Sequence, residues 1–291
     1  MSIGMNTLCL RCLMKKHLDA ADSLGDEKTA MAFSQELLKI LAGTEEWESS
    51  SHISPAINDL YQKYFGLEQD RYVQEKRESN EFLMDKYPKI CRLVDQAQDP
   101  VLAALQFAIL GNYLDFSALA GQVSYEKLDE MLLDALKMEL DLQTYQRFTG
   151  DLARGKKLLY ITDNAGEIVF DRILAETIHN KYPHLDITFC VRGIPVHNDA
   201  TREDAAFVGV PFPMIDNGNE IAGTEVSLLS PAAREAFENA DIIIAKGMGN
   251  TETLYGCNHN VYYAFLIKCQ RFVAYFGKPM LTPMLLSELV K

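Results

Sequence analysis

The chain has 291 residues, 48% of them hydrophobic, and carries 28 Lys and Arg against 41 Asp and Glu, a formal net charge of −13. This length can bury a large core and is typical of one or two domains. The acidic charge, with no run of Lys or Arg, argues against a nucleic-acid partner, because such a surface repels phosphate backbones.

The N-terminal segment and the cysteines indicate the compartment. Arg11, Lys15 and Lys16 interrupt the first apolar stretch, so we expect no signal peptide. An apolar window of about 18 residues, long enough to span a bilayer, occurs nowhere, so we expect no membrane partner. The six cysteines are then expected to stay reduced in a cytoplasm.

Residues 1–150 have the pattern of consecutive helices, with apolar positions three and four apart and no alternating strand. Capping residues, prolines and apolar periodicity predict helix starts at Asp26 and at Ser54-Pro55, a long helix over 70–97 that Pro88 can interrupt, and a helix from Asp99-Pro100 to Gly111. We therefore predict an all-helical N-terminal domain over residues 1–150.

From about residue 155, short apolar runs alternate with helical patterns. The predicted strands are 157–162, 187–192, 213–215, 242–245 and 261–267, and the predicted helices are 167–179, 201–207, 231–239 and 269–276. Nearly all-apolar strands that alternate with helices are typical of a parallel sheet covered on both faces. We therefore predict an α/β domain over residues 151–291 that carries the functional site.

Polar residues follow the predicted strands at the edge where parallel sheets bind their ligands. Asp163 and Asn164 come after the first strand, and Asp199 comes after the second. Two carboxylates and an amide are hard oxygen ligands that suit Mg²⁺ or Mn²⁺. The alternative is that both aspartates cap helices. The same chemistry at two junctions favours the metal site.

Lys246 ends an apolar strand and is followed by Gly247 and Gly249. A lysine at such a strand end can bind a phosphate whose other oxygens accept backbone N–H groups, or it can be a solvated loop residue, and this segment alone leaves both open. A nicotinamide-binding turn is disfavoured, because the first turn carries only Gly166. Ala165 stands where a phosphatase with an aspartyl nucleophile normally has its second Asp, so metal-activated water is the favoured nucleophile.

Two further features have both structural and functional interpretations. Cys9 and Cys12 form a C-x-x-C, which is half of a zinc site. It could be a redox pair, a partial metal site with a distant cysteine such as Cys269, or part of the core, and we favour a structural role. Asn112 and Asp115 follow an apolar helix, where they can accompany ordinary C-capping or line a cleft between the two halves.

Five motifs, in this order along the chain, resemble the metal-dependent damage-control phosphatases, in their prokaryotic, cysteine-bearing branch. The motifs are Cys9-x-x-Cys12, Gly111-Asn112-x-x-Asp115, Asp163-Asn164-x-Gly166-Glu167, Asn198-Asp199-x-Thr201 and Lys246-Gly247-x-Gly249-Asn250-x-Glu252. Each motif alone is weak, but the five together are specific and cover nearly the whole chain. The resemblance implies a helical N-terminal region packed on a three-layer α/β/α sandwich with a mostly parallel sheet.

The resemblance also implies a chemistry. A divalent metal (Mn²⁺, Co²⁺, Ni²⁺ or Mg²⁺) is expected at Asp163, Asn164 and Asp199, and the expected substrates are small phosphorylated metabolites, such as sugar phosphates or damaged phosphometabolites. The positions expected to bind substrate are Asn112, Asp115, Gly166, Glu167, Lys246, Gly247, Gly249 and Asn250. Because a phosphate monoester is dianionic, we assign catalytic roles to Asp163, which orients the attacking water, and to Lys246, which neutralises phosphate charge.

Two other functions stay open. An S-adenosylmethionine-dependent carboxyl methyltransferase has been associated with relatives of this family, but the first turn has fewer glycines than such a cofactor needs. A non-catalytic module that binds a metal or a metabolite would carry the same ligands without turnover.

Overall fold

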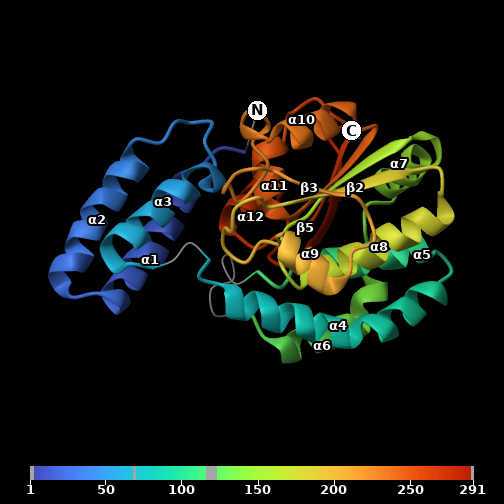
Figure 1. Ribbon diagram of the computed structural model, residues 1–291, viewed down its shortest axis with the longest axis horizontal. Coiled ribbons are helices and arrows are strands. Elements are labelled where there is room, and N and C mark those ends of the chain that lie inside the picture. The colour runs from blue at the N-terminus through green and yellow to red at the C-terminus, as the bar shows by residue number, and fades with distance from the viewer. Residues whose placement is uncertain (1–2, 68–69, 116–122, 290–291) are drawn as a thin grey trace.

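The computed structural model describes residues 3–67, 70–115 and 123–289, which form a three-layer α/β/α sandwich with a group of helices beside it (Figure 1). The helices before the sheet are α1 (Thr7–Leu24), α2 (Glu27–Ala42), α3 (Ser50–Phe65), α4 (Val73–Asp95), α5 (Pro100–Gly111), α6 (Tyr125–Asp134), the 3₁₀ helix η1 (Ala135–Lys137) and α7 (Leu142–Arg154). The later helices are α8 (Glu167–Lys181), α9 (Arg202–Val208), the 3₁₀ helix η2 (Val226–Leu228), α10 (Pro231–Asn239), α11 (Gly247–Leu254) and α12 (Gln270–Phe276). None of the described helices is long and apolar enough to cross a membrane.

The sheet has six strands in the described part of the chain, in the order β3-β2-β1-β4-β5-β6. The strands are β1 (Lys157–Ile161), β2 (Asp186–Val191), β3 (Met214–Asp216), β4 (Ile242–Lys246), β5 (Val261–Leu266) and β6 (Pro283–Leu286). All neighbours are parallel except β5 and β6. The predicted α/β class and the five predicted strands are confirmed. The predictions lack β6, because four residues that begin with a proline make too short a pattern to recognise.

The strand order reverses between β1 and β4. From β1 the chain moves outward through β2 to β3, crosses back to β4, and then continues to β5 on the other side. In a sheet of this kind, a crevice opens beyond the carboxyl ends of the two strands at the reversal. The end of β1 and the end of β4 are therefore where a ligand site is expected.

Alternate residues of the central strands face different helical layers. In β1, Leu158 and Tyr160 pack with α4, α5 and α8 in the largest hydrophobic cluster, whereas Leu159 and Ile161 pack with α10, α11 and α12 in a second one. Helices α4, α5 and α7 precede the sheet in sequence but share its main core. The division into domains at residue 150 stays a prediction.

Helices α1, α2 and α3 have a hydrophobic cluster of their own, which includes Phe33 and Tyr61, and they lie to the left of the sandwich in Figure 1. Side chains near the start of α3 join this group to the sandwich. Ser50 Oγ donates to Glu252 Oε2 (3.0 Å), and Ser51 Oγ donates to the carbonyl of Ala222 (2.8 Å). Both acceptors belong to segments that adjoin the carboxyl edge of the sheet.

The predicted helix start at Ser54-Pro55 is wrong. Helix α3 begins at Ser50, with Ser49 as its N-cap, so Pro55 lies inside the helix. Proline has no N–H to donate to the carbonyl four residues before it, which here is that of Ser51. Ser54 Oγ donates to this carbonyl instead (2.8 Å), which replaces the missing hydrogen bond.

The other helix predictions before the sheet are confirmed. Asp26 caps α2 by accepting from the Thr29 N–H (2.8 Å), and α5 begins at Pro100 behind the N-cap Asp99. Helix α4 runs through Pro88 without a break.

Candidate active site

The site lies at the carboxyl edge of the sheet, where β1, β2 and β4 end. Two backbone hydrogen bonds join the segments after β1 and β2: Ala200 N donates to Asp163 O (2.7 Å), and Ala165 N donates to Asn198 O (2.8 Å). Asn164 and Asp199 also form an isolated antiparallel bridge. The structure thus brings Asp163, Asn164 and Asp199 together.

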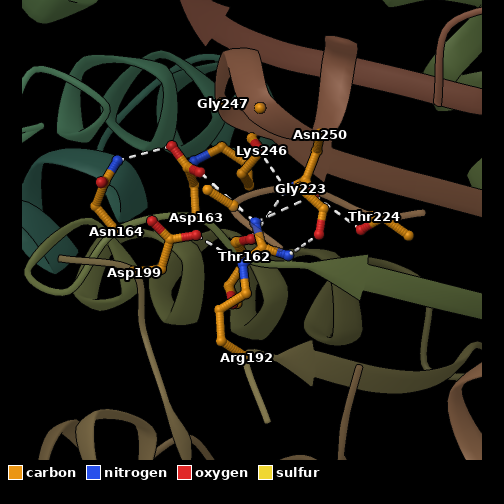
Figure 2. Close-up of polar contacts among 12 residues, drawn as sticks. Thr162, Asp163, Asn164, Arg192, Asp199, Gly223, Thr224, Lys246, Gly247 and Asn250 are labelled. Atoms are coloured by element: carbon orange, nitrogen blue, oxygen red, sulfur yellow. Dashed lines mark hydrogen bonds and ion pairs between the residues drawn. The ribbon is translucent and has the colours of Figure 1, made fainter. Parts of the chain in front are cut away.

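The carboxylates of Asp163 and Asp199 and the amide of Asn164 lie side by side in Figure 2. Asn164 Nδ2 donates to Asp163 Oδ2 (2.7 Å), and Asp199 Oδ2 accepts from Arg192 Nε (2.6 Å). Burial, followed by the charges of Asp199 and Glu167, raises the pKa of Asp163 well above its usual range. Burial also raises the pKa of Asp199, although Arg192 opposes this shift. The site therefore concentrates negative charge that its own cation does not fully offset.

Arg192 is a site residue that the sequence analysis missed. Besides Asp199, its guanidinium donates to the carbonyl of Gly223 (2.6 Å) and to Asn250 Oδ1 (3.2 Å), and it lies 3.9 Å from Asp163 Oδ1 (Figure 2). It is 2% exposed and directly follows β2. A charged residue at the end of an apolar strand was the signal that could have identified it.

Asn112, at the end of α5, contacts the cluster from the helical layer. Its Nδ2 donates to Asp163 Oδ2 and to Glu167 Oε2 (both 2.9 Å), and its Oδ1 accepts from the Leu266 N–H (3.1 Å). Asn112 is fully buried, so it joins α5, β5 and the carboxylate cluster. Its polar atoms are used by the protein, and a direct contact with substrate stays a prediction.

Lys268, just beyond β5, is the second residue that the sequence analysis missed. Its Nζ contacts Asp115 Oδ2 (2.6 Å) and donates to the carbonyl of Asn112 (2.8 Å). It is close enough to Asp163 to oppose the rise in the pKa of that carboxyl. The predicted strand over 261–267 ends directly before this lysine, and that position was the available signal.

Lys246 does not point toward the open edge of the site. Its ammonium is fully buried and donates to the carbonyl of Ala108 (2.9 Å), to Glu167 Oε1 (2.6 Å) and to Asp171 Oδ1 (2.6 Å). Burial lowers the pKa of Lys246, but the two carboxylates outweigh this effect and raise it. A direct contact between Lys246 and a phosphate stays a prediction.

The glycines of the predicted site have different roles. Gly247 has a φ of +78° and lies so close to Asp163 that any β-carbon would overlap the carboxylate. A β-carbon on Gly249 would likewise overlap the carbonyl oxygen of Ala222. The Gly166 N–H donates to Asn80 Oδ1 (2.7 Å).

Asn250 holds the end of β4 together. Its Nδ2 donates to the carbonyls of Thr162 (3.0 Å) and Lys246 (2.6 Å), and its Oδ1 accepts from Arg192 and from Thr224 Oγ1 (2.8 Å) (Figure 2). Substrate contacts by Asn250, Gly166 and Gly249 stay predictions.

The donor set fits a hard divalent cation. Among the described residues, no three His, Cys, Asp or Glu side chains cluster closely enough to hold a metal by themselves. The set here is two carboxylates with an amide, and Mg²⁺ is commonly bound by one or two carboxylates while it keeps several waters. Burial is the main cause of the raised pKa of Asp163, and the charges of Asp199 and Glu167 add to it; a bound cation would offset those charges.

The two cysteines of the C-x-x-C motif lie outside the candidate metal site. Cys9 is half-buried and Cys12 is exposed on α1, and neither forms a disulfide with any cysteine of the described chain. Cys9 lies within electrostatic range of Cys269 and Glu252. Their structural role stays a prediction.

Comparison with known proteins identifies relatives across nearly the whole chain. The family described as "Damage-control phosphatase ARMT1-like domain" matches residues 5–281. A damage-control phosphatase of Archaeoglobus fulgidus is 31% identical over 91% of this chain and 93% of its own, and the uncharacterized protein MJ0202 of Methanocaldococcus jannaschii is 31% identical over 92% and 90%.

A solved structure shows the same fold. The crystal structure of a DUF89 family protein from Pyrococcus horikoshii superposes with a TM-score of 0.80 at 27% identity and covers 98% of this chain and 99% of that one. The damage-control phosphatase PH1575 of that organism is 37% identical over 57% of this chain and 58% of its own. The resemblance found in the five motifs is thereby confirmed, and this chain belongs to the damage-control phosphatase ARMT1-like domain family, two of whose relatives named above are damage-control phosphatases.

Proposed function

We propose that the protein is a divalent-metal-dependent phosphatase that hydrolyses phosphate monoesters of small metabolites, such as sugar phosphates or damaged phosphometabolites. The observation that carries the proposal is the gathering of Asp163, Asn164 and Asp199 at the point where the strand order reverses. The names of the family's phosphatases support the reaction type.

In this proposal Asp163, Asn164 and Asp199 hold Mg²⁺, Mn²⁺, Co²⁺ or Ni²⁺. The bound cation would offset charge on the phosphoryl oxygens and make a water more acidic. Asp163 orients the attacking water, since its carboxylate also accepts from Asn112 and Asn164 and is fixed in direction. Arg192 holds Asp199 in place through a buried ion pair.

In this proposal, the substrate phosphate is bound by groups that follow β4 and β5, across the strand-order reversal from Asp163 and Asp199. The ammonium of Lys268 and the backbone N–H groups at the start of α11 supply positive charge there. Asp115 holds Lys268 before substrate arrives, at 2.6 Å. A transition state with little covalent character requires this positioning and charge stabilisation above all.

The proposal also places the protein in a reducing cytoplasm, with small phosphorylated molecules as its partners. The six cysteines all lie in the described ranges and are free thiols, which supports a reducing compartment.

The test is phosphate release from p-nitrophenyl phosphate and a panel of sugar phosphates. The protein is stripped of metal and resupplied with Mn²⁺, Ni²⁺, Co²⁺ or Mg²⁺. Asp199→Ala should abolish release, whereas Asp241→Ala should not, because Asp241 binds the backbone of Lys156 and Lys157 at the opposite edge of the sheet.

Three other outcomes would contradict the proposal. Release that needs no metal would remove the metal from the reaction. Tight metal binding without any release would favour a binding module. Transfer of a labelled methyl group from S-adenosylmethionine to a carboxyl would favour the methyltransferase.

A further inference from the structure

Lys246 and Glu167 form a closed ion pair beneath the candidate metal site. Both side chains are fully buried, and the Nζ–Oε1 distance is 2.6 Å. The other two hydrogens of the ammonium go to the carbonyl of Ala108 and to Asp171. An ammonium has three hydrogens to donate, so Lys246 has none left for a phosphate in this arrangement.

The second oxygen of Glu167 faces the metal site. Oε2 accepts from Asn164 Nδ2 (2.9 Å), from the Asn164 backbone N–H (3.4 Å) and from Asn112 Nδ2 (2.9 Å). It therefore acts only as an acceptor, and it requires the nitrogen end of the Asn164 amide to turn toward it. The same nitrogen also donates to Asp163 Oδ2 (2.7 Å), so the oxygen is the end of the Asn164 amide that neither Glu167 nor Asp163 binds (Figure 2).

We propose that Lys246 and Glu167 are a buried positioning pair, which holds the nitrogen end of the Asn164 amide so that its oxygen is left for the metal, and that Lys246 acts through Glu167 and not on the substrate. The inference rests on the proposed metal site, and it assigns Lys246 a role different from the phosphate contact expected from its motif. An amide presents a donor at one end and an acceptor at the other, so a reversed Asn164 would offer a metal the wrong group.

Asp171 provides a matched control on the same helix. Asp171 and Glu167 both lie on α8, are both fully buried and both bind Lys246 at 2.6 Å. Asp171 contacts Tyr160 Oη (2.8 Å), and its Oδ2 has no hydrogen-bond partner among the described residues. Of the two carboxylates, Glu167 is the one bonded to Asn164.

The variants Glu167→Gln and Asp171→Asn separate the two roles. In Glu167→Gln, the amide can satisfy Lys246 with its oxygen, but its NH₂ then meets the NH₂ groups of Asn164 and Asn112. In Asp171→Asn, the oxygen can keep both Lys246 and Tyr160, while the NH₂ takes the place of the unpartnered Oδ2. The first variant disturbs Asn164, and the second does not.

The experiment measures the dissociation constant of Mn²⁺ by calorimetry, together with the thermal unfolding of each metal-free variant. We expect Glu167→Gln to weaken Mn²⁺ binding by about 10-fold to 100-fold, the usual effect of losing a group that orients a ligand. Asp171→Asn should bind Mn²⁺ about as the wild type does. If Glu167→Gln does not fold, Glu167→Asp takes its place in the experiment. This variant keeps the charge opposite Lys246 but withdraws the carboxylate from Asn164, so it should also weaken Mn²⁺ binding.

The substrate-contact alternative predicts another pattern. If Lys246 binds phosphate, Lys246→Met should raise KM and the inhibition constant of inorganic phosphate, and Mn²⁺ affinity should not change in any of these variants. That result would overturn the positioning role but leave the phosphatase proposal intact. A wild-type protein that binds no Mn²⁺, Ni²⁺, Co²⁺ or Mg²⁺ would instead overturn the metal site on which both proposals rest.

Discussion

Two buried clusters in this protein each combine one cationic side chain with two carboxylates, but they differ in what they leave open. Arg192 lies 2.6 Å from Asp199 and 3.9 Å from Asp163. Asp163 and Asp199 are 6% and 5% exposed, so this cluster still reaches the crevice beyond the sheet.

The second cluster is closed. Lys246 lies 2.6 Å from both Glu167 and Asp171, and all three side chains are 0% exposed. The same ratio of charges therefore accompanies the proposed metal site where the carboxylates face the strand ends, and the proposed positioning pair where they face a helix layer. Accessibility of the carboxylate oxygens, and not the number of charges, separates the two.

The largest expected effect comes from exchanging one carboxylate in each cluster for its amide. Asp199→Asn removes a proposed metal ligand, and kcat/KM should fall by about 10³-fold or more, since a metal supplies several kcal/mol of charge stabilisation. Asp171→Asn should keep kcat/KM close to that of the wild type. Steady-state kinetics at saturating Mn²⁺ measures both, and equal losses would contradict the division into an open and a closed cluster.

Removing the cation of the closed cluster should affect stability. Lys246→Met leaves two buried carboxylates without a counter-ion and should lower the free energy of unfolding by about 3–5 kcal/mol. Urea denaturation of the metal-free protein measures this. Lys63→Ala, which breaks an exposed pair with Glu36 on the outer helices, is the control and should lower the free energy of unfolding far less than Lys246→Met does. A similar loss in both variants would mean that burial adds nothing to the Lys246 pair.

Glu252 is a buried carboxylate that is bound by a serine hydroxyl in place of a cationic side chain, and its pKa is raised. Burial raises its pKa from 4.5 to about 7, although Ser50 donates to it at 3.0 Å. Between these values the folded protein holds a proton that the unfolded chain releases, so stability should fall as the pH rises from about 4.5 to 7. The full loss of unfolding free energy across this window is about 3 kcal/mol, because a tenfold change in proton affinity corresponds to about 1.4 kcal/mol.

The measurement is the difference in unfolding free energy between the wild type and Glu252→Gln at a series of pH values. The variant has no carboxyl to titrate, so its relative stability should increase as the pH rises through this window. A difference that stays constant from pH 4.5 to 8 would contradict the raised pKa.

The smallest expected effect tests how closely the open cluster is packed. Gly247→Ala combines a positive φ with overlap on the Asp163 carboxylate, and it should cost about 1–3 kcal/mol and weaken Mn²⁺ binding. Gly277→Ala is the control, because Gly277 has a similar φ of +64° but no atom lies within 4 Å of the added β-carbon. The control should therefore cost about 1 kcal/mol and leave Mn²⁺ binding unchanged. Unchanged binding in both variants would mean that Asp163 can move without loss.

The sequence predicted the sheet and the meeting of Asp163 with Asp199 because both depend on local patterns. Apolar runs identify strands, and parallel strands bring their carboxyl ends to one edge. The direction of Lys246 depends on packing that a pattern does not contain. Ile242, Ile244 and Lys246 share one face of β4, and the two isoleucines pack in the cluster that contains α5 and α8. Which helices cover that face is decided only by the complete fold.

Arg192 and Lys268 were missed for a related reason. Each follows a strand, but a single charged residue at a strand end has no distinctive spacing. Their roles follow from partners distant in sequence, such as Gly223 for Arg192 and Asn112 for Lys268. The start of α3 was missed because Pro55, which normally marks a helix start, lies inside that helix.

The two edges of the sheet offer few backbone groups to a strand from another molecule. Its two outermost strands are short, since β3 has three residues and β6 has four, and β6 begins with Pro283, which offers no N–H to a neighbour. Short edge strands with a proline present few free backbone groups on which a strand of another molecule could add. β6 pairs along Tyr263–Leu266 of β5, a wholly buried strand. β6 thus covers the backbone edge of β5, a strand whose side chains are all buried.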